Sequence, residues 1–128
     1  MNFALYGFIA LGGAIGALGR YLLSSWVYNK GDFIFPWGTF VVNVLGCFFL
    51  GMFYVWGAEK LIISPNIRAF LAVGLLGAFT TFSTFSLETL NIIKEGEIKI
   101  ALLNIISSLV VCLFAVWLGM MIAELMSR

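Results

Sequence analysis

The chain has 128 residues, of which 62% are hydrophobic and 10% are charged, and its mean hydropathy is +1.10. A soluble domain of this size needs a more charged surface, so the composition argues against a water-soluble protein and predicts an integral membrane protein. The net charge of +1 provides no basic surface for nucleic acid, and the sequence has no histidine for a metal site or general base.

The apolar residues fall into four blocks, and each is long enough for a helix that crosses a bilayer, which needs about 20 residues. The blocks cover residues 3–27, 37–56, 67–93 and 98–125. Short connections join them. We therefore expect a single all-α membrane domain over residues 1–128, with four transmembrane helices.

The basic residues are divided almost evenly between the two sides of the membrane that these spans imply. One side carries Lys60, Arg68 and Arg128, and the other carries Arg20, Lys30, Lys94 and Lys99. Because orientation follows an excess of Lys and Arg on the cytoplasmic side, this division fixes no orientation. Two interpretations stay open: one weakly determined orientation, or insertion in both orientations followed by antiparallel pairing.

The first span carries a stripe of glycines that ends beside an arginine. Gly12, Gly16 and Gly19 share a narrow arc of the helix, which favours close packing against another helix. Arg20 follows directly. Two roles fit Arg20: its side chain extends to the headgroups, or it lines a wet vestibule and attracts anions.

The second span contains a single amide side chain, Asn43, within its apolar run. An amide offers two N–H donors and one carbonyl acceptor. Asn43 therefore serves either as an interhelical hydrogen-bonding group or as a donor to an anion in a pore. Cys47 in the same span and Cys112 in the fourth lie in apolar blocks, so we expect free thiols there.

The third span contains the most informative stretch, residues 74–86. It holds two glycines, five hydroxyl-bearing residues, and phenylalanines at positions 79, 82 and 85. Glycine and β-branched threonine weaken a helix, and hydrocarbon supplies no water for polar groups. We therefore expect this helix to be broken at bilayer depth, with freed carbonyl groups facing an ion or substrate pathway.

Further polar and aromatic groups in the last two spans have alternative roles. Phe82 and Phe85 lie on one side of a helix and either present their positive ring edges to a small anion or fill a core. Glu88 is an acid within the apolar block and fits a hydrogen-bonding, proton-binding or gating role. A polar stripe in the fourth span either packs against the third or lines a conduit, and its members are Asn104, Ser108 and Cys112.

Three of these segments together resemble the Fluc (CrcB) family of fluoride channels. The matching elements are GGAIGALGRY at 12–21, GTFVVNVLG at 38–46, and GLLG at 74–77 followed by TTFSTFS at 80–86. The last is the most specific. The resemblance extends over the whole chain, in order, and implies a fluoride-selective channel for passive fluoride export and fluoride resistance.

The resemblance also implies an assembly: an antiparallel, dual-topology homodimer with two fluoride pores in the plasma membrane, as in a bacterial inner membrane. A sodium ion (Na+) at the dimer centre would be held by the backbone carbonyls of Gly77 and Thr80. The implied pore lining comprises Asn43, Phe82, Phe85, Ser83, Thr84, Arg20 and Glu88. No residue pattern supports covalent chemistry, so we expect no enzyme.

Two other functions remain as alternatives. A small dual-topology, proton-coupled multidrug exporter needs an acid embedded in the first span, but that span has Arg20 and no carboxylate. A structural subunit without transport would explain the glycines but not the dense hydroxyl and amide content. Release of fluoride from loaded vesicles separates both from a channel.

Overall fold

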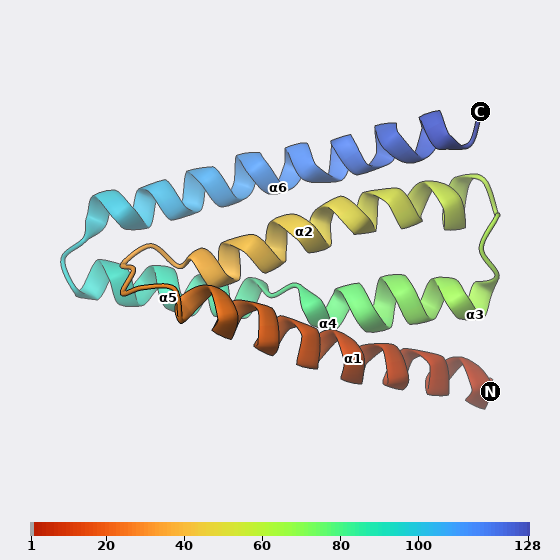
Figure 1. Cartoon of the computed structure of the whole chain (residues 1–128), viewed down its shortest axis with the longest axis horizontal. Helices are drawn as coiled ribbons and strands as arrows, with labels where there is room; N and C mark the ends of the chain where they lie inside the picture. The colour runs from red at the N-terminus through yellow and green to blue at the C-terminus, as the bar shows by residue number, and fades with distance from the viewer. Residues whose placement is uncertain (1) are drawn as a thin grey trace.

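The computed structural model describes residues 2–128, which form four long helical rods that run up and down between two ends (Figure 1). The four expected spanning helices are confirmed, because each rod is long and apolar enough to cross a membrane. The rods are Phe3–Tyr28, Trp37–Glu59, Pro65–Lys94 and Ile98–Met126. Both termini lie at the end that also holds the connection between the second and third rods (Figure 1).

The rods combine α-helix with two stretches of the wider π-helix. The first is α1 (Phe3–Tyr28), and the second joins α2 (Trp37–Tyr54) to η1 (Val55–Glu59). The third comprises α3 (Pro65–Arg68), η2 (Ala69–Leu76), α4 (Gly77–Phe79) and α5 (Phe82–Lys94), and the fourth is α6 (Ile98–Met126). The second rod therefore continues as η1 past residue 56, where its apolar block ends.

Several helix ends follow from single residues. The Asn2 side chain accepts a hydrogen bond from the Leu5 backbone N–H at 3.3 Å and so caps the start of α1. Pro65 occupies the first turn of α3, where its missing N–H costs nothing. Gly96 adopts a φ of +86° in the turn between α5 and α6, a conformation that other residues rarely tolerate.

Glycines bring two pairs of rods into backbone contact. A methyl group on Gly16 of α1 would collide with the Leu75 carbonyl in η2. A methyl group on Gly51 of α2 would collide with the Val116 carbonyl in α6. One on Gly119 of α6 would likewise collide with the Phe48 carbonyl in α2. Because lipid provides no hydrophobic force between helices, this close approach supplies much of the packing energy. The α1–η2 and α2–α6 contacts are the most extensive in the chain.

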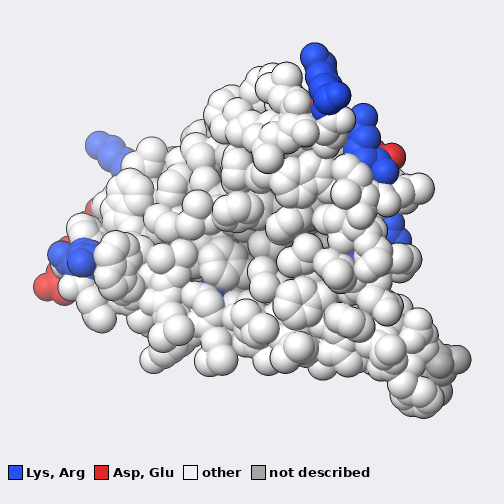
Figure 2. Space-filling view, turned by 45° about the vertical axis from the view of Figure 1, so that its right-hand side comes forward, with Lys and Arg blue, Asp and Glu red and all other residues white. Residues whose placement is uncertain are grey.

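The outer surface of the bundle is apolar, and its charges gather mainly at the two ends on the face that Figure 2 shows. The second rod is the most enclosed, with 39% of its most apolar stretch buried, against 11% for the first and third. The third rod, which carries the hydroxyl-rich stretch, is therefore largely uncovered by its own chain.

The third rod is not helical at Thr80 and Thr81, where Figure 1 draws a thin link between α4 and α5. Thr80 has φ −85° and ψ 154°, and Thr81 has φ −150° and ψ 113°, so both backbones are extended. We call this link, residues 80–81, the interruption. It leaves the last carbonyls of α4 and the first N–H groups of α5 without helical partners.

Candidate functional site

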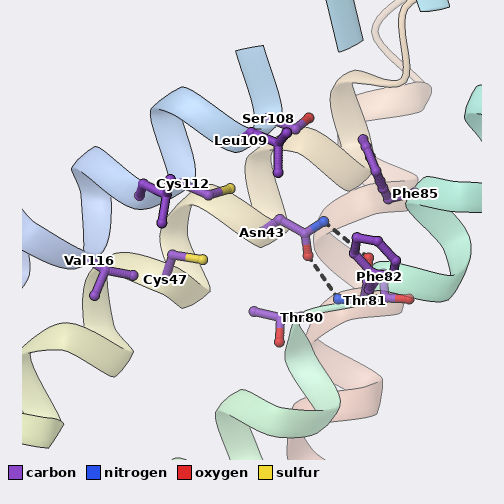
Figure 3. Close-up of a pocket in the computed structure, with 11 residues that line it drawn as sticks. Asn43, Cys47, Thr80, Thr81, Phe82, Phe85, Ser108, Leu109, Cys112 and Val116 are labelled. Carbon is purple, nitrogen blue, oxygen red and sulfur yellow. Dashed lines mark hydrogen bonds between the residues drawn. The ribbon is translucent and has the colours of Figure 1, made fainter. Parts of the chain in front are cut away.

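Asn43 binds both backbone groups of one residue in the interruption. Its Nδ2 donates to the Thr81 carbonyl at 3.1 Å, and the Thr81 N–H donates to its Oδ1 at 2.8 Å (Figure 3). The amide thus satisfies the backbone N–H and C=O of Thr81, as a neighbouring β-strand would do for an extended residue. One N–H of the amide remains for another acceptor, because an asparagine carries two.

Arg20 and Thr80 satisfy carbonyls on the α4 side of the interruption. The Arg20 side chain crosses from α1, and its Nε donates to the Ala78 carbonyl at 3.1 Å. The Thr80 hydroxyl donates to the Leu76 carbonyl at 2.9 Å, and so does the Thr80 N–H at 3.0 Å. The guanidinium therefore turns inward to the third rod, where its positive charge lies within the span rather than at its end.

Thr81 caps the start of α5 on the other side of the interruption. Its hydroxyl oxygen accepts a hydrogen bond from the Thr84 N–H at 3.1 Å. The hydroxyls of Ser83 and Thr84 lie 3.2 Å and 3.0 Å from the same oxygen. These three residues form one connected group of hydroxyls at the N-terminal end of α5, where the helix dipole is positive.

Three carbonyls at the interruption have no internal partner. Within residues 2–128, no N–H or hydroxyl across the interruption donates to the carbonyl of Gly77, Phe79 or Thr80. Thr81 is the residue whose N–H would reach Gly77 in a continuous helix, but that N–H bonds to Asn43 instead. The interruption thus leaves three carbonyl oxygens of one short segment free to accept a donor or bind a cation.

A cavity of about 290 Å³ lies beside the interruption, between α2, α5 and α6 (Figure 3). Its mostly apolar wall includes the polar side chains of Asn43, Thr80, Thr81 and Ser108. The remaining lining residues are Cys47, Phe82, Phe85, Leu109, Cys112, Leu113 and Val116. We call this space the mid-span cavity.

Phe82 and Phe85 form an aromatic pair at the mid-span cavity. Their ring centroids are 5.5 Å apart, with 42° between the ring planes. Phe85 is half-buried, whereas Phe82 is 74% exposed, although it sits in the middle of a spanning rod. Phe82 therefore has few contacts within its own chain and offers a large apolar surface to whatever lies beside the third rod.

Glu88 lies two turns along α5 from the interruption, outside the mid-span cavity. The Tyr28 hydroxyl donates to its Oε1 at 2.9 Å, and Thr39 contacts the same tyrosine hydroxyl at 3.4 Å. The other carboxyl oxygen, Oε2, is buried and has no hydrogen-bond partner within residues 2–128. This orphaned acceptor is available to a proton, a water molecule or a donor.

A buried amide connects α5 to α6 on the side away from the first rod. Asn104, which is 1% exposed, donates through Nδ2 to the Thr89 hydroxyl at 2.8 Å. Ser108 donates to its Oδ1 at 3.2 Å. The Thr89 hydroxyl donates in turn to the Phe85 carbonyl at 2.7 Å. The polar face of the fourth span thus packs against the third at Asn104 and reaches the mid-span cavity at Ser108.

The structure brings only some of the residues predicted from sequence together. Asn43, Phe82, Phe85 and Thr80 share the mid-span cavity. The predicted residues that lie outside its wall are Arg20, Gly77, Ser83, Thr84 and Glu88.

Several residues of the site were missing from the sequence-based set, among them Thr81, Cys47 and Tyr28. Thr81 could have been found as a threonine directly before a helix, a common cap. Cys47 lies one turn after Asn43 and so shares its helical face. Tyr28 gives no comparable signal, because its contact with Glu88 joins residues 60 positions apart.

The fold and the site define a small multi-pass membrane protein whose third rod carries polar groups at mid-span. The chain belongs to the CrcB-like family, because the family model described as "CrcB-like protein, Camphor Resistance (CrcB)" matches residues 7–120. This family assignment confirms the resemblance found in the sequence.

Curated relatives cover nearly the whole chain. A protein of Magnetococcus marinus, named fluoride-specific ion channel FluC, is 48% identical over 117 residues, which are 91% of this chain and 95% of the relative. Proteins of the same name from Geotalea daltonii and a Shewanella species are 45% and 51% identical, over 91% and 87% of this chain and 94% and 89% of theirs.

Proposed function

We propose that this chain is the subunit of a fluoride-selective channel, through which fluoride leaves the cell passively and which thereby confers fluoride resistance. Relatives that bear this function in their names match the chain almost from end to end. The observation that carries the proposal is the polar interruption, held by Asn43 beside a cavity within the membrane. An ion channel carries out no covalent chemistry, in keeping with the expectation of a non-enzyme.

The chemistry of the mid-span cavity suits fluoride. A pore for a small, strongly hydrated anion must replace its water with donors while binding it weakly enough for release. The spare N–H of Asn43 is one donor, and the positive ring edges of Phe82 and Phe85 are further favourable contacts. The guanidinium of Arg20, bonded to the Ala78 carbonyl, adds positive potential close by.

A polar route along α5 extends the proposed pathway from the cavity to one membrane face. Ser83 and Thr84 supply hydroxyl donors at the start of α5, and Glu88 lies further along the same helix. Arg20 is proposed to attract anions towards the pathway from the first rod. A hydroxyl can donate to fluoride and accept from the next group, so such a chain passes an anion between donors.

The working unit is proposed to be an antiparallel homodimer with two pores, inserted in both orientations. Phe82 is 74% exposed and the third rod is largely uncovered, so a second copy would bury surface that one chain leaves open. Each pore would then combine Phe82 and Phe85 from different subunits. The nearly even division of basic residues permits both orientations in the membrane.

A sodium ion at the centre of this dimer is part of the proposal. The carbonyls of Gly77 and Thr80 have no internal partner, and carbonyl oxygens suit hard cations. Two copies would contribute four such oxygens. The ion would supply positive potential between the two pores. The chain's own role is to keep these carbonyls free, because the Thr81 N–H bonds to Asn43 and the Thr84 N–H bonds to the Thr81 hydroxyl.

The subunits are proposed to reside in the plasma membrane, which is the inner membrane in bacteria such as those that carry the relatives. The proton-coupled exporter is not favoured, because the first rod contains no carboxylate and the matched relatives are named as channels. Fluoride, lipid and a second copy of the chain are therefore the proposed partners.

The test is fluoride efflux from vesicles that contain the purified protein. We expect fluoride to leave down its gradient when a potassium ionophore balances charge, with chloride released far more slowly. Efflux should be unchanged when a proton ionophore removes any proton gradient. Vesicles that retain fluoride, or that release it only with a proton gradient imposed, would overturn the proposal.

A further inference from the structure

Both cysteines of the chain face the mid-span cavity from adjacent helices. Cys47 lies on α2 and Cys112 on α6, and both are free and half-buried. Both side chains line the mid-span cavity across the α2–α6 contact, and Figure 3 draws both pointing into the same space. Two thiols from different helices thus share one wall of the cavity.

Glycine packing holds this thiol pair in register. Cys47 is one turn before Gly51, and Cys112 is one turn before Val116. Gly51 lies against the Val116 carbonyl, where an added methyl group would not fit. The two helix backbones therefore approach closely one turn from the sulfurs, so the sulfurs do not need a large rearrangement to bind one ligand together.

We propose that Cys47 and Cys112 form a dithiol site for a soft, two-coordinate metal cation of the Hg²⁺ type. Thiolate sulfur prefers soft metal ions over hard ones. Each thiol loses one proton on binding, so one Hg²⁺ replaces two protons and two Hg–S bonds form. No other reactant is needed, and no group changes its oxidation state.

The number of ligands and the surroundings select the cation. Zn²⁺ and similar ions favour four ligands, but the residues at 2–128 hold no cluster of three or more Cys, His, Asp or Glu side chains that suits a metal. A divalent cation bound by two thiolates is electrically neutral, so the bound metal adds no net charge to a mostly apolar wall. A monovalent soft cation would leave one negative charge there.

Occupancy of the dithiol site would block the proposed channel, because Asn43, Phe82 and Phe85 line the same cavity. This second step depends on the proposed function, whereas metal binding by the two thiols does not. The site would make fluoride export sensitive to soft metals at the point where the anion is proposed to pass.

Binding is tested on the full-length protein in detergent, with Hg²⁺ alone as the probe. We expect one Hg²⁺ per chain, the release of two protons per metal, and protection of both cysteines from alkylation. Cys47→Ser and Cys112→Ser should each weaken binding by about 100-fold or more, because the second sulfur acts at a high local concentration. Equal affinity in the wild type and either single variant would overturn the dithiol site.

The matched control is the double variant Cys47→Ser with Cys112→Ser, which contains no cysteine. It should bind no Hg²⁺ with comparable affinity, and Cd²⁺ should bind the wild type far more weakly than Hg²⁺ does. Retention of the helical circular dichroism spectrum shows that each variant is folded. Failure of well-folded wild-type protein to release protons with Hg²⁺ would also overturn the proposal.

Efflux measurements then separate the dithiol site from the channel proposal. Each variant is compared with its own efflux before Hg²⁺, and we expect inhibition in the wild type but not in the cysteine-free double variant. Stoichiometric binding without inhibition would keep the metal site and overturn its position in the fluoride pathway. Absence of fluoride efflux before any metal is added would contradict the proposed function and leave the binding result standing.

Discussion

Asn43 holds the interruption with the same amide that is proposed to meet the anion. One N–H and the carbonyl of this side chain are engaged with Thr81, at 3.1 Å and 2.8 Å. Only the second N–H is left for a passing ion. The structural and the anion-binding roles considered for this residue are therefore compatible, because they use different atoms of one amide.

Replacing Asn43 with leucine removes both roles at similar side-chain size. We expect Asn43→Leu to lower the free energy of unfolding by about 1–3 kcal/mol, because Thr81 keeps an unsatisfied N–H and C=O. Fluoride efflux should fall about tenfold or more, since losing about 1.4 kcal/mol of stabilisation on the pathway costs a factor of ten. Denaturation in detergent and vesicle efflux measure the two effects.

Asn66→Leu is the matched control, because the Asn66 side chain makes no hydrogen bond within residues 2–128 and lies in α3, away from the cavity. It should leave efflux near the wild-type rate. Normal fluoride efflux in a folded Asn43→Leu protein would show that the pathway runs elsewhere.

The contact between Tyr28 and Glu88 predicts an energetic coupling between the first and third rods. The tyrosine hydroxyl is the only donor to Glu88 within residues 2–128. In a double-mutant cycle with Tyr28→Phe and Glu88→Met, we expect a coupling of about 0.5–3 kcal/mol in the free energy of unfolding. Effects that add to within about 0.3 kcal/mol would mean that the hydrogen bond contributes no stability.

Residue roles at the site were only partly predictable from the sequence. Composition and spacing single out Asn43 and the 74–86 stretch, because polar groups inside an apolar block stand out. They give no information on partners, since the Asn43–Thr81 and Arg20–Ala78 contacts join residues 38 and 58 positions apart. Such pairings depend on how the rods pack, which local patterns do not encode.

At the scale of the elements, the rods are joined by two kinds of contact. Glycines join α1 to η2 and α2 to α6 through backbone approach. The shorter α5 is attached to α6 by the buried amide of Asn104 and the Thr89 hydroxyl. The interruption therefore separates a tightly packed half of the third rod from a half held mainly by polar side chains.

Two glycines of α1 test whether the close packing between α1 and η2 stabilises the protein. Gly16→Ala should destabilise the protein by about 1–3 kcal/mol, because its methyl group would meet the Leu75 carbonyl. Gly13→Ala is the control: an added methyl group there has nothing within 4 Å, and alanine is the better helix former by up to about 1 kcal/mol. Unfolding midpoints in detergent compare the two variants, and equal midpoints would contradict the packing role of Gly16.

The elements were more predictable from the sequence than the contacts. Four apolar blocks of sufficient length lead directly to four rods, because bilayer thickness sets the number of residues in each. Glycine spacing on the first span indicates a packing face without naming the partner helix. The π-helical stretches η1 and η2 have no local signature in the sequence.

At the scale of the whole molecule, a single chain leaves uncovered the rod that carries the polar interruption. Phe82 is 74% exposed, and the third rod is among the least enclosed. The two ends of the bundle carry three basic residues each, and Arg20, which lies within the first span, raises the total of one side to four. An antiparallel pair of identical chains would cover the third rod, and it needs both orientations in one membrane.

Two oppositely biased variants test the antiparallel pair. The first combines Lys30→Ala, Lys94→Ala and Lys99→Ala, and the second combines Lys60→Ala and Arg128→Ala. All five side chains are exposed at the ends of the bundle and lie outside the mid-span cavity. The first variant has one basic residue, Arg20, on one side of the membrane and three on the other. The second has one, Arg68, on one side and four on the other. Because orientation follows the excess of Lys and Arg, each variant should insert in one orientation.

Neither variant alone should form antiparallel pairs, so cells that express only one of them should be sensitive to fluoride. Co-expression supplies both orientations and should restore fluoride resistance to near the wild-type level. Accessibility of a labelled C-terminus from each side of the membrane reports the orientation of each variant directly. Full resistance from one variant whose labelled terminus lies entirely on one side would exclude the antiparallel dimer, because no oppositely oriented partner would then exist.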